Sequence, residues 1–395
     1  MPDTWTNTSW LTYPYRQAAT YPDATHLANA VTQLHTKKNL VHLSEIQRLK
    51  HALAKAGRGQ AFILQGGDCA ESFHDCRPAI IRAQLRLMFK MANILAPRVN
   101  GPVVPIGRIA GQYAKPRSSY YEQRQGITLP SYRGDLVNAV HFDEQARVPN
   151  PARLLQGYRS ATSTLNFIRN SLKNTAFYTS HEALHLHYES ALTRRSTQGF
   201  WYDFSTHLPW LGIRTSQLDG AHVEFLRGIS NPLGIKIGPD ATVDWLLSLL
   251  EHLNPQREEG RILLITRLGA QHVGPLLPTY IQATQTHHHP VTWACDPMHG
   301  NNQHTPSGIK TRHMTTIWQE LEQTLQIHHT YQSHLGGIHL EMTPESVTEC
   351  LDSTAHLQET DLKTAYRSLL DPRLNRQQAL ELIRKFGSAL NQLLR

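Results

Sequence analysis

Eight short segments rich in apolar and β-branched residues recur along the chain, and segments of helix length separate most of them. Several are almost continuously apolar, as is typical of parallel strands covered on both faces. Strands that alternate with helices predict an α/β fold, and eight repeats fit a (β/α)8 TIM barrel, with a doubly wound open sheet as the alternative. The predicted strands are residues 61–65, 103–107, 175–180, 204–210, 233–238, 261–266, 291–295 and 336–341.

Polar residues follow nearly every predicted strand, and this placement favours the barrel over the open sheet. Clusters of Gly, His or charged residues begin as the strands end, for example QGGDCAES at 65–72 and RLGA at 267–270. In a (β/α)8 barrel the carboxyl ends of all strands meet on one face. We therefore expect these clusters to form a single site on that face.

Two stretches stand outside the alternation. Residues 1–60 are polar and carry a helical pattern at 43–57, so we expect an N-terminal extension packed on a barrel of residues 61–395. Residues 110–160 form a long insert after the second strand, and long ordered loops are usually functional. Apolar residues at helical spacing predict helices of the barrel itself, at 81–96, 242–253 and 314–327.

Charge and cysteine content exclude several classes of protein. The 395 residues carry a net charge of +8 without a dense basic run, so we expect no nucleic-acid partner. No apolar run approaches about 18 residues, and no secretory signal pattern opens the chain, so we expect a cytoplasmic protein without a membrane partner. The four cysteines include no C-x-x-C pair, which excludes a zinc ribbon.

Six Lys and Arg residues lie within or soon after the predicted strands and would converge in a barrel. Arginine binds phosphate or carboxylate through two parallel hydrogen bonds, and lysine supplies a point charge. Cations gathered in one cavity repel each other unless anions fill it, so the expected ligand is a small molecule with two or more phosphate or carboxylate groups. The six residues are Arg108, Lys115, Arg117, Arg214, Lys236 and Arg267.

One thiol, one imidazole and two carboxylates also follow predicted strands or lie near the C-terminus: Cys69, His299, Glu341 and Asp371. Such a mixed set suits Mn²⁺, Co²⁺, Fe²⁺ or Zn²⁺ better than an all-oxygen Ca²⁺ site. Their wide spacing is unlike that of a local metal motif. On spacing alone, a lone Cys is more often a small buried apolar residue and a lone His a satisfied polar one.

Ten sequence motifs make the chain resemble the class II (plant-type) 3-deoxy-D-arabino-heptulosonate 7-phosphate (DAHP) synthases, and the resemblance runs in order from about residue 10 to residue 395. The resemblance implies a (β/α)8 barrel that condenses phosphoenolpyruvate with erythrose 4-phosphate, using a divalent metal, in the first step of the shikimate pathway. The motifs are QGGDCAESF, GRIAGQYAKPRS, YRGDLVN, SHEALHLHYESALTR, QLDGAHVEFLRGISNPLGIKIGP, ITRLGA, TWACDPMHGN, GIKTR, GGIHLEMTPESVTEC and DPRLN.

The resemblance also assigns residues to roles. Its metal ligands would be Cys69, His299, Glu341 and Asp371, with Mn²⁺ or Co²⁺ expected first and Fe²⁺ or Zn²⁺ as alternatives. Phosphoenolpyruvate would contact Arg108, Arg214, Lys236 and Arg267. The aldose phosphate and its carbonyl end would meet Lys115, Arg117 and Ser118 of the KPRS motif. The residues expected to act directly in catalysis are Lys115, Lys236 and Arg108.

The chain is most similar to the short members of this family. These often serve secondary metabolism, such as phenazine-type pathways, and tend to escape feedback inhibition. We expect a homo-oligomer, either a dimer or a tetramer, and a chorismate-mutase-like protein is a further partner to consider.

Two positions depart from the family pattern. Ile213 stands where the family usually has an acidic residue directly before the Arg of W-x-G-x-R-T, and that side chain helps to orient the water near C2 of phosphoenolpyruvate. Leu370 stands where the family often has Cys, so Cys69 cannot form a disulfide with that neighbour. The first departure leaves two alternatives open: a related synthase that uses an altered aldose or amino sugar phosphate, and an inactive barrel that binds a metabolite as a regulator.

Overall fold

Eight parallel strands close into a barrel in this computed structural model, which describes residues 5–173, 175–352 and 357–393. Each predicted strand segment contributes one barrel strand, and β14 pairs back to β1, so the barrel is confirmed and the open sheet is wrong. In order around the barrel the strands are β1 (Phe62–Gly67), β2 (Val103–Arg108), β5 (Tyr178–Glu182), β8 (Leu208–Leu211), β9 (Leu233–Ile237), β10 (Ile262–Thr266), β11 (Val291–Cys295) and β14 (Leu335–Glu341).

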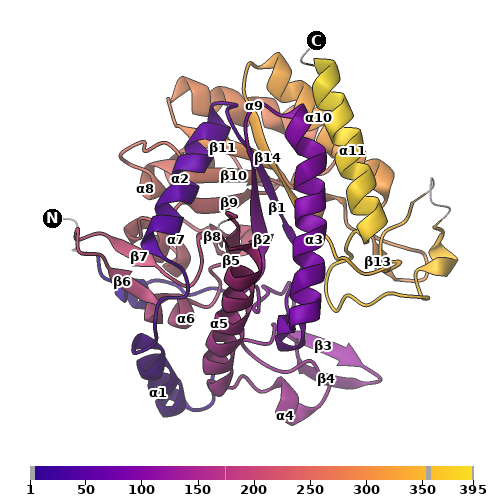
Figure 1. Cartoon of the computed structure of the whole chain (residues 1–395). Helices are drawn as coiled ribbons and strands as arrows, with labels where there is room; N and C mark the ends of the chain where they lie inside the picture. Colours follow the sequence, from indigo (N-terminus) through magenta and orange to yellow (C-terminus); the bar gives the residue numbers. More distant parts are fainter. Residues whose placement is uncertain (1–4, 174, 353–356, 394–395) are drawn as a thin grey trace.

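A helix follows every barrel strand along the chain, and the helices surround the sheet (Figure 1). The three helices predicted from periodicity correspond to α3, α8 and α10. Helix α3 begins earlier than predicted, at Pro78, because proline is well tolerated in the first turn of a helix. The outer helices are α3 (Pro78–Leu95), α5 (Ala152–Leu172), α6 (Leu186–Ala191), α7 (Ala221–Gly228), α8 (Val243–Leu253), α9 (Val273–Thr286), α10 (Met314–Thr330) and α11 (Arg376–Leu393).

The inside of the barrel changes from apolar to polar along the strands. Ile63 of β1 and Leu263 of β10 lie on strands that are not neighbours, yet they share one buried cluster, so both point inward. Leu49 and Leu53 of α2 (Leu43–Gly57) belong to the same cluster, which places α2 across the amino ends of the strands. Alternate residues further along the strands continue the inward face. These inward residues are polar: Gln65, Arg108, Ser180, Glu182, His339 and Glu341.

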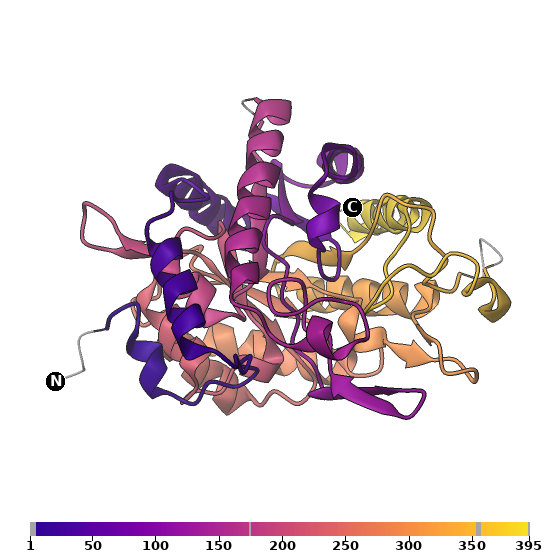
Figure 2. The ribbon, with the colours of Figure 1, turned by 90° about the horizontal axis from the view of Figure 1, so that it is seen from below.

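The insert after β2 is ordered, as the sequence predicts for residues 110–160. It contains a hairpin of β3 (Tyr121–Arg124) and β4 (Ile127–Pro130), which projects from the body of the molecule (Figures 1 and 2). The short helix α4 (Glu144–Arg147) follows. Two further small hairpins complete the structure: β6 (Thr193–Arg195) with β7 (Trp201–Asp203), and β12 (Gln303–His304) with β13 (Lys310–Thr311).

The N-terminal part of the chain packs on the barrel at two places. Trp10 is buried in the apolar cluster that α7, α8 and α9 form with the strands beneath them. Helix α1 (Ala24–His35) packs on α5 and α6. Since α2 also packs on the strand ends, the boundary predicted at residue 60 between an extension and a barrel of residues 61–395 stays a prediction. The outermost residues of those two units, 1–4 and 394–395, lie outside the described part.

Candidate active site

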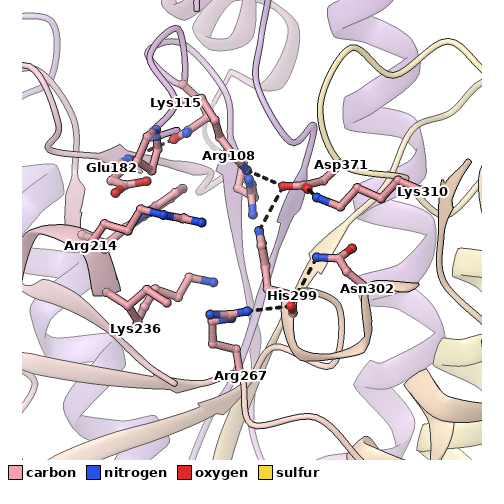
Figure 3. A pocket seen from close by; sticks show the side chains of 15 residues that line it. Arg108, Lys115, Glu182, Arg214, Lys236, Arg267, His299, Asn302, Lys310 and Asp371 are labelled. Carbon is pink, nitrogen blue, oxygen red and sulfur yellow. Dashed lines mark hydrogen bonds and ion pairs between the residues drawn. The ribbon is translucent and has the colours of Figure 1, made fainter. Parts of the chain in front are cut away.

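One pocket at the carboxyl ends of the barrel strands gathers most of the residues that the sequence singled out (Figure 3). Strands or the loops that follow them supply every wall, as a (β/α)8 barrel requires of a site at this end. The lining residues are Arg108, Gln112, Lys115, Pro116, Glu182, Trp210, Gly212, Ile213, Arg214, Lys236, Arg267, His299, Asn302, Lys310 and Asp371.

Five of the six predicted cations line this pocket. Two of them lie on barrel strands, and three lie on the loops that follow β2, β8 and β10. Figure 3 shows their amino and guanidinium groups directed into one space. The five are Arg108, Lys115, Arg214, Lys236 and Arg267.

Arg117 and Ser118 are not among the residues that line the pocket. The wall is formed by Lys115 and Pro116, while Arg117 is half-buried and Ser118 is exposed in the next part of the loop. The two residues therefore do not share the pocket wall with the other cations, and the structure does not test their predicted contact with the aldose phosphate. This contact stays a prediction about a loop that borders the pocket.

Three of the four predicted metal ligands form a compact buried cluster. The Sγ of Cys69 and one carboxylate oxygen each of Glu341 and Asp371 lie within 4.8 Å of one another. His299 joins them, since its Nε2 lies 2.9 Å from Glu341 Oε1 and 4.0 Å from Asp371 Oδ2. A sulfur, a nitrogen and carboxylate oxygens at this spacing fit a borderline divalent ion.

Lys115 lies between these donors and the open pocket. Its Nζ is 2.9 Å from Cys69 Sγ and 2.9 Å from Asp371 Oδ2. Burial alone would lower the pKa of Lys115, but Asp371, Cys69 and Glu341 outweigh it and raise the pKa above the usual range. Lys115 therefore stays protonated at any physiological pH and brings a fixed positive charge to the donor cluster.

Fixed cations neutralise the two carboxylates of the cluster. Glu341 accepts hydrogen bonds from Arg108 at 3.0 Å and from the buried Arg312 at 2.8 Å. Asp371 pairs with Lys115 and Lys310. Burial would raise the pKa of both carboxyl groups, but the surrounding charges hold both pKa values well below their usual range. Both side chains are therefore ionised and ready to bind a cation.

The thiol of Cys69 behaves differently. Burial, followed by the neighbouring carboxylate of Glu341, raises its pKa above the ordinary thiol value. Its Sγ donates to Asp371 Oδ2 at 3.4 Å. A divalent ion would be needed to displace this proton, because a coordinated thiol is deprotonated by the metal itself. All four cysteines are free, and the side chain at 370 is leucine, so no disulfide competes for Cys69 in the described structure.

Asp296 links His299 of the donor cluster to Lys236 of the cationic pocket, and sequence reasoning missed it. Its Oδ2 lies 2.6 Å from His299 Nδ1 and also pairs with Lys236 Nζ. A carboxylate on the second ring nitrogen fixes the orientation of a metal-binding imidazole. Burial is the largest influence on Lys236 and lowers its pKa to about 8, although Asp296 opposes this shift.

Glu182 is the second residue that sequence reasoning missed. It lies at the end of β5 in the SHEAL motif, and its Oε1 is buried without a hydrogen-bond partner among the described residues. Burial raises its pKa, although Lys115, Arg214 and Lys236 act in the opposite direction. Its carboxylate packs against Gly212, where an added Cβ would lie 2.0 Å from Oε1. An acceptor thus lies in the same pocket wall as Ile213, against the preceding residue Gly212.

Other residues of the site could have been found from motifs that were quoted but given no role. Lys310 and Arg312 belong to GIKTR, and both pair with carboxylates of the donor cluster. Trp210 lies under two cations, with its ring centroid 5.3 Å from the Arg108 guanidinium and 6.0 Å from Lys236 Nζ. An aromatic face at these distances attracts both cations and helps to hold them.

This arrangement defines an enzyme class: a (β/α)8 barrel with a cationic pocket for small anionic substrates beside a sulfur, nitrogen and oxygen donor cluster. The sequence profile of the Class-II DAHP synthetase family matches residues 5–174 and 170–386. Phospho-2-dehydro-3-deoxyheptonate aldolase of Neurospora crassa is 41% identical, over 96% of this chain and 92% of that protein. The aldolase of the same name from Streptomyces coelicolor is 38% identical, over 95% of each chain. This chain therefore belongs to the class-II DAHP synthetase family.

A solved structure supports the fold independently. The phospho-2-dehydro-3-deoxyheptonate aldolase of Francisella tularensis superposes with a TM-score of 0.57, covering 96% of this chain and 99% of that chain. The two chains share 13% sequence identity, so this likeness concerns the fold alone.

Proposed function

We propose that this chain condenses phosphoenolpyruvate with erythrose 4-phosphate to give DAHP and inorganic phosphate. The observation that carries the proposal is the pocket that Arg214, Lys236 and Arg267 share with His299 and Asp371. Cys69 and Glu341 do not line this pocket, but they complete the donor cluster with His299 and Asp371. Two phosphates and a carboxylate would meet five cations in this space. The membership of the chain in the class-II DAHP synthetase family supports the same reaction.

Phosphoenolpyruvate would lie on the cationic side of the pocket. Arg214 and Arg267 have no carboxylate partner among the described residues. One Arg267 nitrogen donates to the His299 carbonyl at 2.6 Å, and the other N–H groups of the two guanidinium groups are available to the phosphate and carboxylate. Lys236 adds a charge on the inner wall. Arg108 is held by the carbonyls of Asp68 and Cys69, so it presents a fixed charge between the two halves of the site.

A divalent ion would be held by Cys69, His299, Glu341 and Asp371, and their donor types and separations fit one. We propose Mn²⁺ or Co²⁺, with Fe²⁺ or Zn²⁺ as the alternatives. When bound, such an ion supplies Lewis-acid polarisation of a carbonyl oxygen.

The acceptor aldehyde would lie near Lys115, with its phosphate toward Arg117 and Ser118. Lys115 remains protonated because carboxylates surround it, so it can donate a hydrogen bond to the aldehyde oxygen as negative charge develops there. C3 of phosphoenolpyruvate forms the new carbon–carbon bond to the aldehyde carbon. Positive charge then develops at C2, beside the phosphate that will leave.

Glu182 would position the water that adds to C2. Glu182 lines the pocket together with Ile213 and Arg214, and its free carboxylate oxygen lies against Gly212. Burial raises the pKa of Glu182, which makes its carboxylate a stronger base toward a water proton. The water oxygen bonds to C2, and one of its protons passes to Glu182. The C–O bond to phosphate then breaks, the remaining proton of the C2 hydroxyl leaves with the phosphate, and C2 becomes the ketone. The proton held by Glu182 balances the one that the former aldehyde oxygen takes up to become a hydroxyl.

Three further expectations stay predictions: assembly as a homodimer or homotetramer, a chorismate-mutase-like partner, and a place in secondary metabolism. None of the helices in the described part of the chain is long and apolar enough to cross a membrane. Light scattering of the purified protein, alone and with a candidate mutase, would measure the first two.

A direct assay tests the proposed reaction. Purified protein loaded with Mn²⁺ or Co²⁺ should release one phosphate for each DAHP formed from phosphoenolpyruvate and erythrose 4-phosphate. Arg267→Ala should raise the KM for phosphoenolpyruvate and lower kcat together, since Arg267 would bind both the ground state and the transition state. Binding of phosphoenolpyruvate without turnover of any aldose phosphate would contradict the proposal and favour the regulator.

A further inference from the structure

An N-terminal segment, residues 13–21, crosses from the surface to the loop that borders the pocket. We call residues 115–118, the KPRS motif, the acceptor loop. Tyr15 anchors the segment on the barrel, because its OH donates to the Leu184 carbonyl at 3.1 Å and accepts from the Leu186 N–H at 2.8 Å. Tyr21 adds a contact of 2.7 Å between its OH and His185 Nε2. The residues that the two tyrosines contact, 184–186, follow Glu182 at the carboxyl end of β5.

Gln17, between these anchors, makes a reciprocal pair of hydrogen bonds with the acceptor loop. The Arg117 N–H donates to Gln17 Oε1 at 2.9 Å, and Gln17 Nε2 donates to the Arg117 carbonyl at 3.2 Å. The two residues are 100 positions apart in the chain. The side-chain amide thus pairs with the loop backbone much as a neighbouring strand would, and it satisfies both backbone polar groups of Arg117.

Arg133 of the YRGD motif, to which the reaction assigns no role, holds Gln17 from the other side. Its guanidinium donates to the carbonyls of Gln17 and Ala18, and its own carbonyl accepts the Lys115 N–H at 3.0 Å. Gln17 has a φ of 56°, a left-handed backbone conformation that residues other than glycine rarely adopt without such support. Arg133 therefore fixes both the N-terminal segment and the acceptor loop.

Gly134 allows this close approach. Its φ is 96°, and an added Cβ would lie 2.1 Å from the Tyr113 carbonyl oxygen. The insert after β2 can thus pass directly against the start of the acceptor loop. Within the described residues the Arg117 side chain makes no hydrogen bond or ion pair, so its placement depends on the backbone that Gln17 holds.

We infer that Gln17 is a positioning residue for the acceptor aldose phosphate and acts through the backbone of Arg117. This inference rests on the proposed assignment of Lys115, Arg117 and Ser118 to that substrate. A residue that orders the loop should change the KM for erythrose 4-phosphate more than kcat. It should leave phosphoenolpyruvate binding unchanged, because Arg214, Lys236 and Arg267 lie on other elements.

The test compares Gln17→Met, which keeps the side-chain length and removes both hydrogen bonds, with Thr20→Ala at an exposed position of the same segment. Gln17→Met should raise the KM for erythrose 4-phosphate about tenfold. Thr20→Ala should leave it unchanged. In both variants the KM for phosphoenolpyruvate and the melting temperature should stay near the values of the unmodified enzyme.

Arg117→Ala and the double variant complete the cycle. If Gln17 acts through Arg117, Gln17→Met should add little to the loss that Arg117→Ala already causes. A full additive loss, or a parallel rise of both KM values, would show a merely structural role and overturn the inference. If Arg117→Ala raises the KM for erythrose 4-phosphate and Gln17→Met does not, the inference alone fails. If Arg117→Ala changes nothing, the assignment of the acceptor loop fails, and the inference fails with it.

Discussion

The two halves of the pocket differ in how their charges are balanced. In the donor half, Glu341 and Asp371 are each paired with at least two fixed cations. In the cationic half, Arg214 and Arg267 have no carboxylate partner among the described residues, and Glu182 in the same wall has a carboxylate oxygen without a hydrogen-bond partner. The protein therefore balances the charges of the donor half itself, whereas the charges of the cationic half are balanced only when anionic substrates bind.

This difference separates two kinds of preorganisation. Paired carboxylates stay ionised and in place whether or not substrate is present, as a metal site requires. Unpaired cations in one cavity repel each other. A substrate that carries a phosphate and a carboxylate relieves this repulsion when it binds, which contributes to its binding free energy. Substitutions in the donor half should therefore remove activity altogether, whereas those in the cationic half should weaken particular substrates or steps.

The largest effect is expected in the donor half, from Cys69→Ser. Serine is a far poorer ligand than thiolate for Mn²⁺, Co²⁺, Fe²⁺ or Zn²⁺. Metal affinity and turnover should fall by about 100-fold or more, since even residues that only support a metal ligand cost 10–100-fold. Metal content after dialysis, measured by mass spectrometry beside the rate, would show this loss.

Cys76→Ser is the matched control for that experiment. Cys76 is half-buried outside the pocket, against the hydroxyl of Tyr113 at 3.2 Å. It should retain both metal and rate. Full turnover of Cys69→Ser in excess chelator, with no bound metal, would remove the donor half from the mechanism.

Glu182→Gln should cause the next largest loss. Removing the group that orients and deprotonates a water costs about 10²–10⁴-fold, and we expect a loss of kcat near the lower limit because neighbouring cations still hold the phosphate. The KM for phosphoenolpyruvate should change little. Steady-state kinetics would measure both, with Glu251→Gln on the exposed face of α8 as the control. An unchanged kcat would mean that another group holds the water.

The sequence predicts a site residue correctly where its place at the end of a barrel strand alone brings it into the site. Arg108, Lys236 and Glu341 lie on strands, and His299 and Arg267 on the loops after strands, so the barrel pattern alone predicts that they converge. Glu182 and Asp296 lie at equivalent positions, but nothing in a single sequence distinguishes a free carboxylate from a paired one. That distinction depends on which cations pack around each group in the folded structure.

Contacts between distant segments were beyond prediction for a different reason. Gln17 reaches Arg117 only because Tyr15 and Arg133 fix the path of the N-terminal segment, and no periodicity encodes such a path. The same limit applies to Arg117 itself. Its motif placed it in the site, whereas the structure places it in the loop beyond the pocket wall.

The pH dependence should distinguish the two halves more finely. Burial lowers the pKa of Lys236 to about 8, so this lysine loses its charge as the pH rises above that value. The kcat/KM for phosphoenolpyruvate should then fall about tenfold for each pH unit above pH 8, because the neutral amine no longer attracts the anion. The carboxylates of the donor half are ionised throughout this range.

Lys236→Arg checks the assignment, because arginine keeps its charge far above this pH. Its kcat/KM for phosphoenolpyruvate should start lower, since the geometry of the pair with Asp296 changes, but it should stay level as the pH rises. If kcat/KM for phosphoenolpyruvate stays constant up to about pH 9.5 in the unmodified enzyme, the charge of Lys236 does not contribute to phosphoenolpyruvate binding.

The smallest effect should come from Ile213→Glu, which restores the acidic residue of the family pattern. The aliphatic side chain of Ile213 packs toward Gly238, close to the Arg267 guanidinium, and Glu182 already places a carboxylate against Gly212. A second carboxylate here would repel the first and pair with a cation meant for phosphoenolpyruvate. We therefore expect kcat to stay within about threefold of the unmodified value, or to fall, while the KM for phosphoenolpyruvate rises. A gain in kcat of about tenfold or more would instead show that water activation limits this enzyme, and that Glu182 does not replace the missing residue.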